Sequence, residues 1–167
     1  MKRRSLIIGG AAALGLGWLL RPDERGSDHN PYFTDLSAAL DRAQLAKPTL
    51  VVDHQRLLEN IRTLRGHINQ RFDYRIVVKS LPSLPLLETV MEAAGSQRLM
   101  VFHQPFLNQV AAHFPQADVL LGKPMPVVAA HNFYRQFAGG GFDPARQLRW
   151  LLDTPERVNQ YDELARA

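Results

Sequence analysis

The sequence contains no cysteine among its 167 residues. This absence excludes a disulfide framework, a thiolate metal site and a cysteine nucleophile, and it leaves the redox compartment open. A strong excess of one charge is also lacking, because the net charge is only +4 and residues 1–26 supply most of it with five basic and two acidic residues. A nucleic-acid binder concentrates Lys and Arg on a folded surface, so the mixed charges of the remaining chain predict no nucleic-acid partner.

Several motifs of catalysis and metal binding are missing as well. No Gly-x-Ser-x-Gly elbow or Walker-type loop occurs, which excludes those hydrolase and nucleotide-binding patterns. The six histidines include no His-x-x-x-His pair, so these residues predict no metal site within the chain. Gly139-Gly140-Gly141 precedes a predicted strand instead of following one, and we interpret it as a helix-to-strand connector.

The N-terminal residues have the pattern of a targeting or anchoring segment. Lys2-Arg3-Arg4 is followed by the uncharged residues 5–20 and then by the charged residues 21–25. Sixteen helical residues would rise about 24 Å, short of the roughly 30 Å hydrocarbon core, which favours a signal sequence or a short tilted anchor. No small-x-small cleavage site follows, which favours an N-terminal hydrophobic helix that is retained in the membrane.

The location of the protein follows from the same segment. Arg3-Arg4-Ser5-Leu6-Ile7 resembles a twin-arginine export signal, and the positive N-terminus predicts that the body lies outside the membrane. We therefore expect a membrane-anchored or exported protein on the periplasmic side, with residues 21–47 as a linker and lead-in. A buried soluble helix is the alternative for residues 5–20, and their four glycines disfavour it.

Residues 48–167 alternate short β-branched runs with helical periods, which predicts βα units and a parallel sheet. Helices are expected after Asp53, over Leu84–Ala94, from about Pro105, over Val127–Phe137 and from Pro155. The predicted strands are Thr49–Val52, Arg75–Val78, Arg98–Phe102, Asp118–Leu121 and Leu148–Leu152.

The number of βα units defines the expected fold. Four units follow residue 74, which is half of an eight-stranded barrel, so we predict an α/β fold that is a partial TIM-type (β/α)8 barrel. A smaller open α/β sheet is the alternative. A half-barrel leaves an apolar sheet face exposed to water or to another chain, and we therefore expect the natural chain to continue beyond Ala167.

Functional residues of parallel α/β folds gather at the carboxyl ends of the strands. Among these positions Lys79 directly follows Ile76-Val77-Val78, where burial would favour a neutral, nucleophilic amine. The alternative is a surface lysine whose stem packs on the sheet. The other polar residues predicted at this edge are Asp53, His103, Lys123 and Asp153.

Three segments carry a resemblance to a known family. They are Pro48-Thr49-Leu50-Val51-Val52-Asp53 with the following Leu57-Leu58-Glu59-Asn60-Ile61, then Arg75-Ile76-Val77-Val78-Lys79-Ser80, and finally Leu148 to Glu156. Together they resemble the alanine racemase N-terminal-domain family, the fold-type III pyridoxal-phosphate enzymes. The most similar branch contains D-threonine aldolase and D-serine dehydratase.

The resemblance implies a site and a cofactor. Lys79 matches the lysine that holds pyridoxal 5′-phosphate as a Schiff base, and Arg75 matches an arginine on the same strand of the aldolase-like branch. His103 stands where a residue facing the cofactor is implied, although a strand-end histidine bonded to a neighbouring loop is the simpler interpretation. The phosphate loop and the His and Cys ligands of any divalent metal belong to later parts of such enzymes. Their sites are often completed across a dimer, which allows for a homodimer here.

The expected function is therefore the N-terminal part of a pyridoxal-phosphate-dependent racemase, aldolase or dehydratase that acts on small amino acids, of the D or the L form. Leu81, Pro82 and Ser83 depart from the polar residues that usually follow the cofactor lysine. This departure keeps two alternatives open. One is a non-catalytic, membrane-tethered α/β scaffold or truncated remnant that no longer binds the cofactor, and the other is a regulatory protein that carries it without turnover.

Overall fold

The structure is a computed structural model that describes residues 26–45, 47–69, 71–80, 83–137 and 139–166. The chain divides into two compact units, Met1–Val51 and Val52–Ala167. The leader at residues 1–25 lies outside the described residues, so its targeting role stays a prediction. Among the helices that are described, none has both the length and the apolar character needed to cross a bilayer.

Helix α2 (Pro31–Arg42) is the described element of the first unit. Asn30 caps it, because its side chain accepts a hydrogen bond from the backbone N–H of Phe33 at 3.2 Å, and Pro31 occupies the first turn. The linker and lead-in expected over residues 21–47 therefore contains a helix in its described part. The Asn-Pro pair was the available signal for its start.

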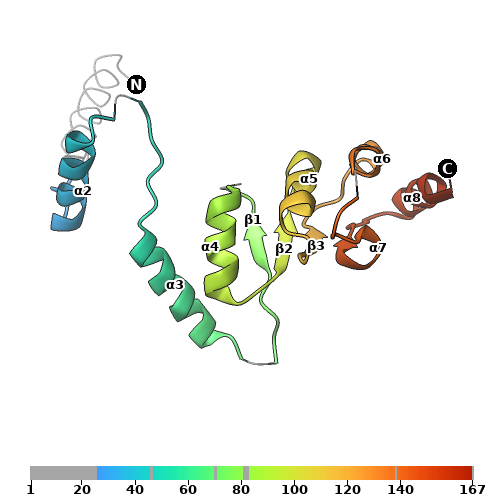
Figure 1. Cartoon of the computed structure of the whole chain (residues 1–167), viewed down its shortest axis with the longest axis horizontal. Helices are drawn as coiled ribbons and strands as arrows, with labels where there is room; N and C mark the ends of the chain where they lie inside the picture. The colour runs from blue at the N-terminus through green and yellow to red at the C-terminus, as the bar shows by residue number, and fades with distance from the viewer. Residues whose placement is uncertain (1–25, 46, 70, 81–82, 138, 167) are drawn as a thin grey trace, which may run out of the picture. The chain divides into compact units, whose positions relative to one another are not determined.

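The second unit is built on a four-stranded, all-parallel sheet with the strand order β1-β2-β3-β4. Figure 1 labels the first three of these strands, which lie side by side. The mixed α/β fold with a parallel sheet is therefore as predicted. Val78 of β1 pairs with Val101 of β2, which in turn pairs with Leu121 of β3. The strands are β1 (Ile76–Val78), β2 (Arg98–Val101), β3 (Asp118–Leu121) and β4 (Leu148–Arg149).

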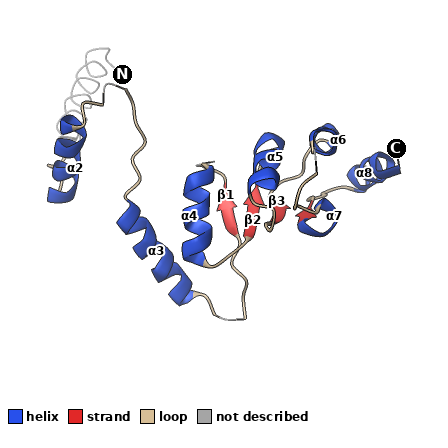
Figure 2. Cartoon of the chain, viewed as in Figure 1, coloured by secondary structure: helices blue, strands red, loops and turns tan. Residues whose placement is uncertain are grey.

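Helices connect the strands, as Figure 2 shows. The predicted helix starts are confirmed, because Asp53 accepts from the N–H of Arg56 at 3.0 Å and Thr154 from that of Arg157 at 3.1 Å. Gly95 ends α4 with φ of 60°, a conformation that glycine adopts without strain. The helices are α3 (His54–His67), α4 (Leu84–Ala94), α5 (Gln104–His113), α6 (Val127–Gln136), α7 (Pro144–Gln147) and α8 (Pro155–Arg166).

The sheet has one buried face and one open face. Side chains alternate between the faces along a strand, and the buried set packs with the helices in one core. The opposite face, called the open face below, carries Val77, Met100, Leu120 and Arg149. Val77 is 57% exposed, so this apolar face is only partly removed from water. The buried strand residues are Ile76, Val78, Leu99, Val101, Val119, Leu121 and Leu148.

The strand predicted over Thr49–Val52 is wrong. These residues form no strand, and Leu50 is 74% exposed. A β-branched run becomes a strand only where a neighbouring strand accepts its backbone hydrogen bonds, and the described sheet begins at β1. For the same reason β4 ends at Arg149 instead of Leu152, because only its first residues reach β3.

Arg75 ties the strands together at their amino ends. Its guanidinium donates to the backbone carbonyls of Leu99 and Asp118 at 2.9 and 2.8 Å, and to the carboxylate of Asp118 at 2.8 Å. Arg149 donates to the same carboxylate at 2.9 Å. Asp118 therefore links Arg149 of β4 with Arg75, which precedes β1, and its side chain is 28% exposed.

We predict that Asp118→Ala lowers the free energy of unfolding by about 2 kcal/mol, because it leaves the half-buried Arg75 guanidinium without its carboxylate. Asp73→Ala is the matched control. Asp73 is 69% exposed and pairs with Arg98 at 2.9 Å, so its loss should cost less than about 1 kcal/mol. Urea denaturation of the two variants measures both values, and equal losses would contradict the bridging role of Asp118.

Candidate functional site

Lys79 lies directly after β1, at the carboxyl end of the sheet. The alternation that buries Ile76 and Val78 places Lys79 on the open face, in line with Val77. Its side chain is exposed. The expectation that burial surrounds this amine is therefore wrong, because the face to which it belongs is partly open to water. The same exposure leaves the amine accessible to a dissolved carbonyl compound.

Phe102 is the neighbour of Lys79 that sequence reasoning missed. The lysine ammonium lies over the phenyl ring, 5.6 Å from its centroid. This distance is within the range of a cation–π interaction. The signal was available, since Phe102 follows β2 as Lys79 follows β1 and both continue the same period of two.

His103 has a structural task at the start of α5. Its Nδ1 accepts a hydrogen bond from the backbone N–H of Phe106 at 3.3 Å, and the two rings are tilted with centroids 5.9 Å apart. The imidazole thus has a structural role, as the simpler interpretation expected, but its partner is the first turn of its own helix and not a neighbouring loop. The side chain is nonetheless exposed at the same edge of the sheet as Lys79, and its contact with a cofactor stays a prediction.

Arg75 lies at the opposite end of the strands from Lys79. They are four positions apart in extended chain, which corresponds to about 13 Å along the strand. The guanidinium is engaged by Asp118 and by the Leu99 carbonyl. The structure therefore does not bring Arg75 and Lys79 together, and the cofactor-binding role of Arg75 stays a prediction.

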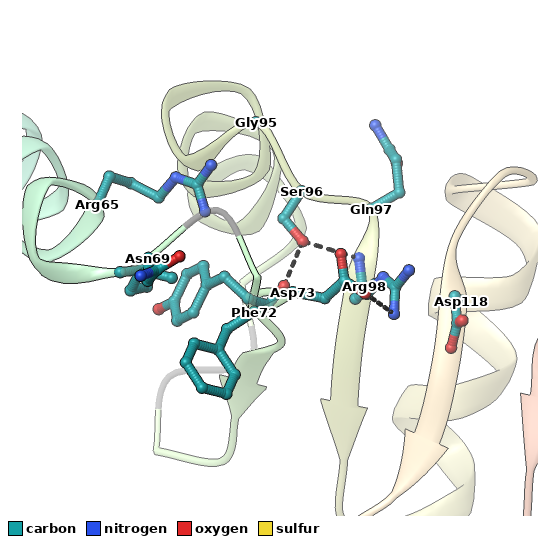
Figure 3. A pocket seen from close by; sticks show the side chains of 11 residues that line it. Arg65, Asn69, Phe72, Asp73, Gly95, Ser96, Gln97, Arg98 and Asp118 are labelled. Carbon is teal, nitrogen blue, oxygen red and sulfur yellow. Dashed lines mark hydrogen bonds and ion pairs between the residues drawn. The ribbon is translucent and has the colours of Figure 1, made fainter.

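A polar pocket of about 470 Å³ also lies at the amino ends of the strands (Figure 3). Arg98 pairs there with Asp73, and the Ser96 hydroxyl donates to the carbonyl of Tyr74 at 2.5 Å. Several of its polar groups thus bind each other. Ligands of parallel α/β sheets bind at the carboxyl ends, so this location favours a stabilising role.

An aromatic groove of about 760 Å³ lies between α6 and α8. Trp150 donates from its indole nitrogen to the Tyr134 hydroxyl at 3.2 Å, and its ring meets that of Tyr161 edge-on at 5.7 Å. The Tyr161 hydroxyl donates to the Met125 carbonyl at 3.2 Å. Burial raises the pKa of Tyr161, partly opposed by the nearby charge of Arg157. These contacts attach α8 to the rest of the unit.

Within the part of the chain that the structure describes, no group of three or more His, Asp and Glu side chains could hold a metal ion. The Gly139-Gly140-Gly141 segment connects α6 to the short helix α7, which directly precedes β4. The expected connection from helix to strand therefore contains an additional helix. Its first two glycines have φ of 82° and 127°, which side-chain-bearing residues rarely adopt. At the carboxyl edge, the pair of Lys79 and Phe102 is therefore the strongest candidate for a reactive site.

Comparison with known proteins adds no relative. No protein-family model, curated protein or solved structure matches the chain. The resemblance to fold-type III enzymes therefore stays a prediction from the sequence motifs.

We predict that stability falls above about pH 10, because Tyr161 ionises more readily in the unfolded chain than in its buried position. Because the pKa of Tyr161 is higher in the folded protein, the folded state keeps the hydroxyl proton to higher pH than the unfolded chain does. The contribution of Tyr161 to stability is therefore complete below its pKa in the unfolded chain, and it is lost as the pH rises through its pKa in the folded protein. Tyr161→Phe should remove this part of the pH dependence. Urea denaturation of both proteins at neutral and alkaline pH tests it, and parallel losses would contradict it.

Proposed function

We propose that the chain is the N-terminal part of a pyridoxal-phosphate-dependent racemase, aldolase or dehydratase that acts on small amino acids. Lys79 is the residue that attaches the cofactor. The observation that carries this proposal is the exposed Lys79 amine on the open face, at the carboxyl end of β1. The leader would anchor or export the enzyme.

The strand order favours half of a barrel rather than a doubly wound sheet as the fold of this unit. Parallel crossovers nearly always have the same hand, so an order that advances by one strand each time keeps its connecting helices on one face. A doubly wound sheet instead reverses direction at a switch point and places helices on both faces. The order β1-β2-β3-β4 contains no reversal, which is the topology of half a (β/α)8 barrel whose interior would be the open face.

The residues at this edge fit part of the cofactor. Lys79 offers the amine that reacts with an aldehyde, and Phe102 offers an aromatic surface beside it. In the described residues, no Gly-rich loop that could bind the phosphate lies between a strand and the following helix. We propose that later strands supply this part of the site, as they do in the family that the motifs resemble.

The protein's own residues would have distinct tasks. When bound, the cofactor supplies an electron sink for negative charge at the α-carbon of the substrate. Lys79 would hold the cofactor through its amine, and Phe102 would limit the directions from which the cofactor ring can approach. Arg75 acts at a distance, because its bonds to Leu99 and Asp118 hold the strands in register.

The test is covalent attachment of pyridoxal 5′-phosphate to the full chain, trapped with borohydride and located by peptide mass spectrometry. The chain contains four lysines, and we expect Lys79 to be labelled in preference to the others at low reagent concentration. Lys79→Ala should abolish the visible absorbance of the bound cofactor. Lys123→Ala is the matched control, since Lys123 is exposed in the connection between β3 and α6.

A second candidate is a tethered scaffold that no longer binds the cofactor. The lack of a Gly-rich loop between a strand and the following helix in the described residues favours it. Labelling spread equally over all lysines of a folded full chain would support the scaffold and overturn the enzyme proposal. A regulatory protein would instead show selective Lys79 labelling without racemisation, aldol cleavage or deamination of D-amino acids by the complete protein.

A further inference from the structure

Lys79, Phe102 and Gly122 form one row across the open face of the sheet. The pairing of Val78 with Val101, and of Val101 with Leu121, fixes the register of β1, β2 and β3. Lys79, Phe102 and Gly122 each follow one of these three paired residues. Neighbouring strands are about 4.8 Å apart, so the three positions are adjacent at the carboxyl edge.

Gly122 leaves the space that the Phe102 ring occupies. A Cβ atom at Gly122 would lie 2.5 Å from Cζ of Phe102 and 2.8 Å from Cγ of Met100. Real Cβ atoms essentially never approach that closely, so any other residue at Gly122 would force the ring to move. The phenyl ring thus lies across the glycine, an arrangement by which aromatic side chains compensate for glycine in sheets.

The position of the ring determines what surrounds the Lys79 amine. The ammonium lies over the phenyl face, 5.6 Å from the ring centroid. On the other side of Phe102, Gly122 has no side chain that could displace the ring. Phe102 is half-buried and Lys79 is exposed, so a dissolved molecule can reach the amine and one part of the ring. A planar molecule bound to Lys79 therefore has an aromatic surface within stacking distance.

We propose that Phe102, held across Gly122, is a positioning residue that makes the Lys79 site selective for aromatic over aliphatic carbonyl compounds. This inference deepens the proposed function and rests on its use of Lys79 as a carbonyl-capturing amine. The neutral ε-amine adds to the carbonyl carbon, one water leaves, and a carbon–nitrogen double bond remains. An aromatic ring carried on that carbon gains an offset or edge-to-face contact with Phe102, whereas a saturated ring of similar size gains only burial.

The experiment compares benzaldehyde with cyclohexanecarbaldehyde on the full chain in the presence of cyanoborohydride. Cyanoborohydride delivers hydride to the carbon of the double bond and is itself oxidised, which leaves a stable secondary amine at each labelled lysine. Peptide mass spectrometry gives the ratio of aromatic to saturated label at each site. The ratio at Lys123 corrects for the different intrinsic reactivities of the two aldehydes.

We expect the corrected ratio at Lys79 to be about two- to tenfold above that at Lys123, the range that one aromatic pair provides. Phe102→Leu should bring it down to the Lys123 value, and Phe102→Tyr should preserve it. Gly122→Ala should also lower it, because the added methyl group displaces the ring. Circular dichroism confirms that each variant is folded.

The outcomes separate this inference from the proposed function. Equal ratios at Lys79 and Lys123 in the unmodified chain would overturn the inference without any variant, and so would an aromatic preference that survives in folded Phe102→Leu. Selective labelling of Lys79 by pyridoxal 5′-phosphate would still support the proposed function in either case. Conversely, a preference for benzaldehyde that depends on Phe102, without selective attachment of pyridoxal 5′-phosphate, would support the positioning role and overturn the enzyme proposal.

Discussion

The in-register pairing of the parallel strands decides which side chains of this protein can meet. Because side chains alternate between the two faces, a single register places Ile76, Leu99 and Val119 in the core and Val77, Met100 and Leu120 on the open face. A slip by one residue would exchange the two sets and expose the core. Burial of the apolar face therefore sets the register of the strands, and this register also fixes the position of Lys79 relative to Phe102.

The amino ends of the strands carry residues that stabilise the sheet, and the carboxyl ends carry the residues of the candidate site. At the amino ends, Arg75, Asp118 and Arg149 form a charged network in which each group faces an opposite charge. At the carboxyl ends, Lys79 faces the phenyl ring of Phe102. The exposed Lys79 amine is accessible to a dissolved carbonyl compound, whereas the paired guanidinium groups hold the strands.

Local backbone chemistry explains why some polar residues at the carboxyl edge are structural. A helix begins with unpaired N–H groups, and His103, which follows β2, accepts one of these hydrogen bonds at the start of α5. Such capping uses the same polar residue types that catalysis uses. Lys79 cannot accept a hydrogen bond from a backbone N–H when it is protonated, so its place at this edge has no explanation as a helix cap.

The sequence by itself determined the α/β class, the parallel sheet and most helix boundaries, because hydrophobic periodicity and capping residues act within a few neighbouring residues. It also placed Lys79 at the end of the first sheet strand. Only the tertiary structure decided that Thr49–Val52 forms no strand and that Lys79 is exposed, since both depend on which elements lie alongside. The contact of Phe102 with Gly122 was likewise hidden, because it joins two strands whose register is set by the packing of the whole sheet.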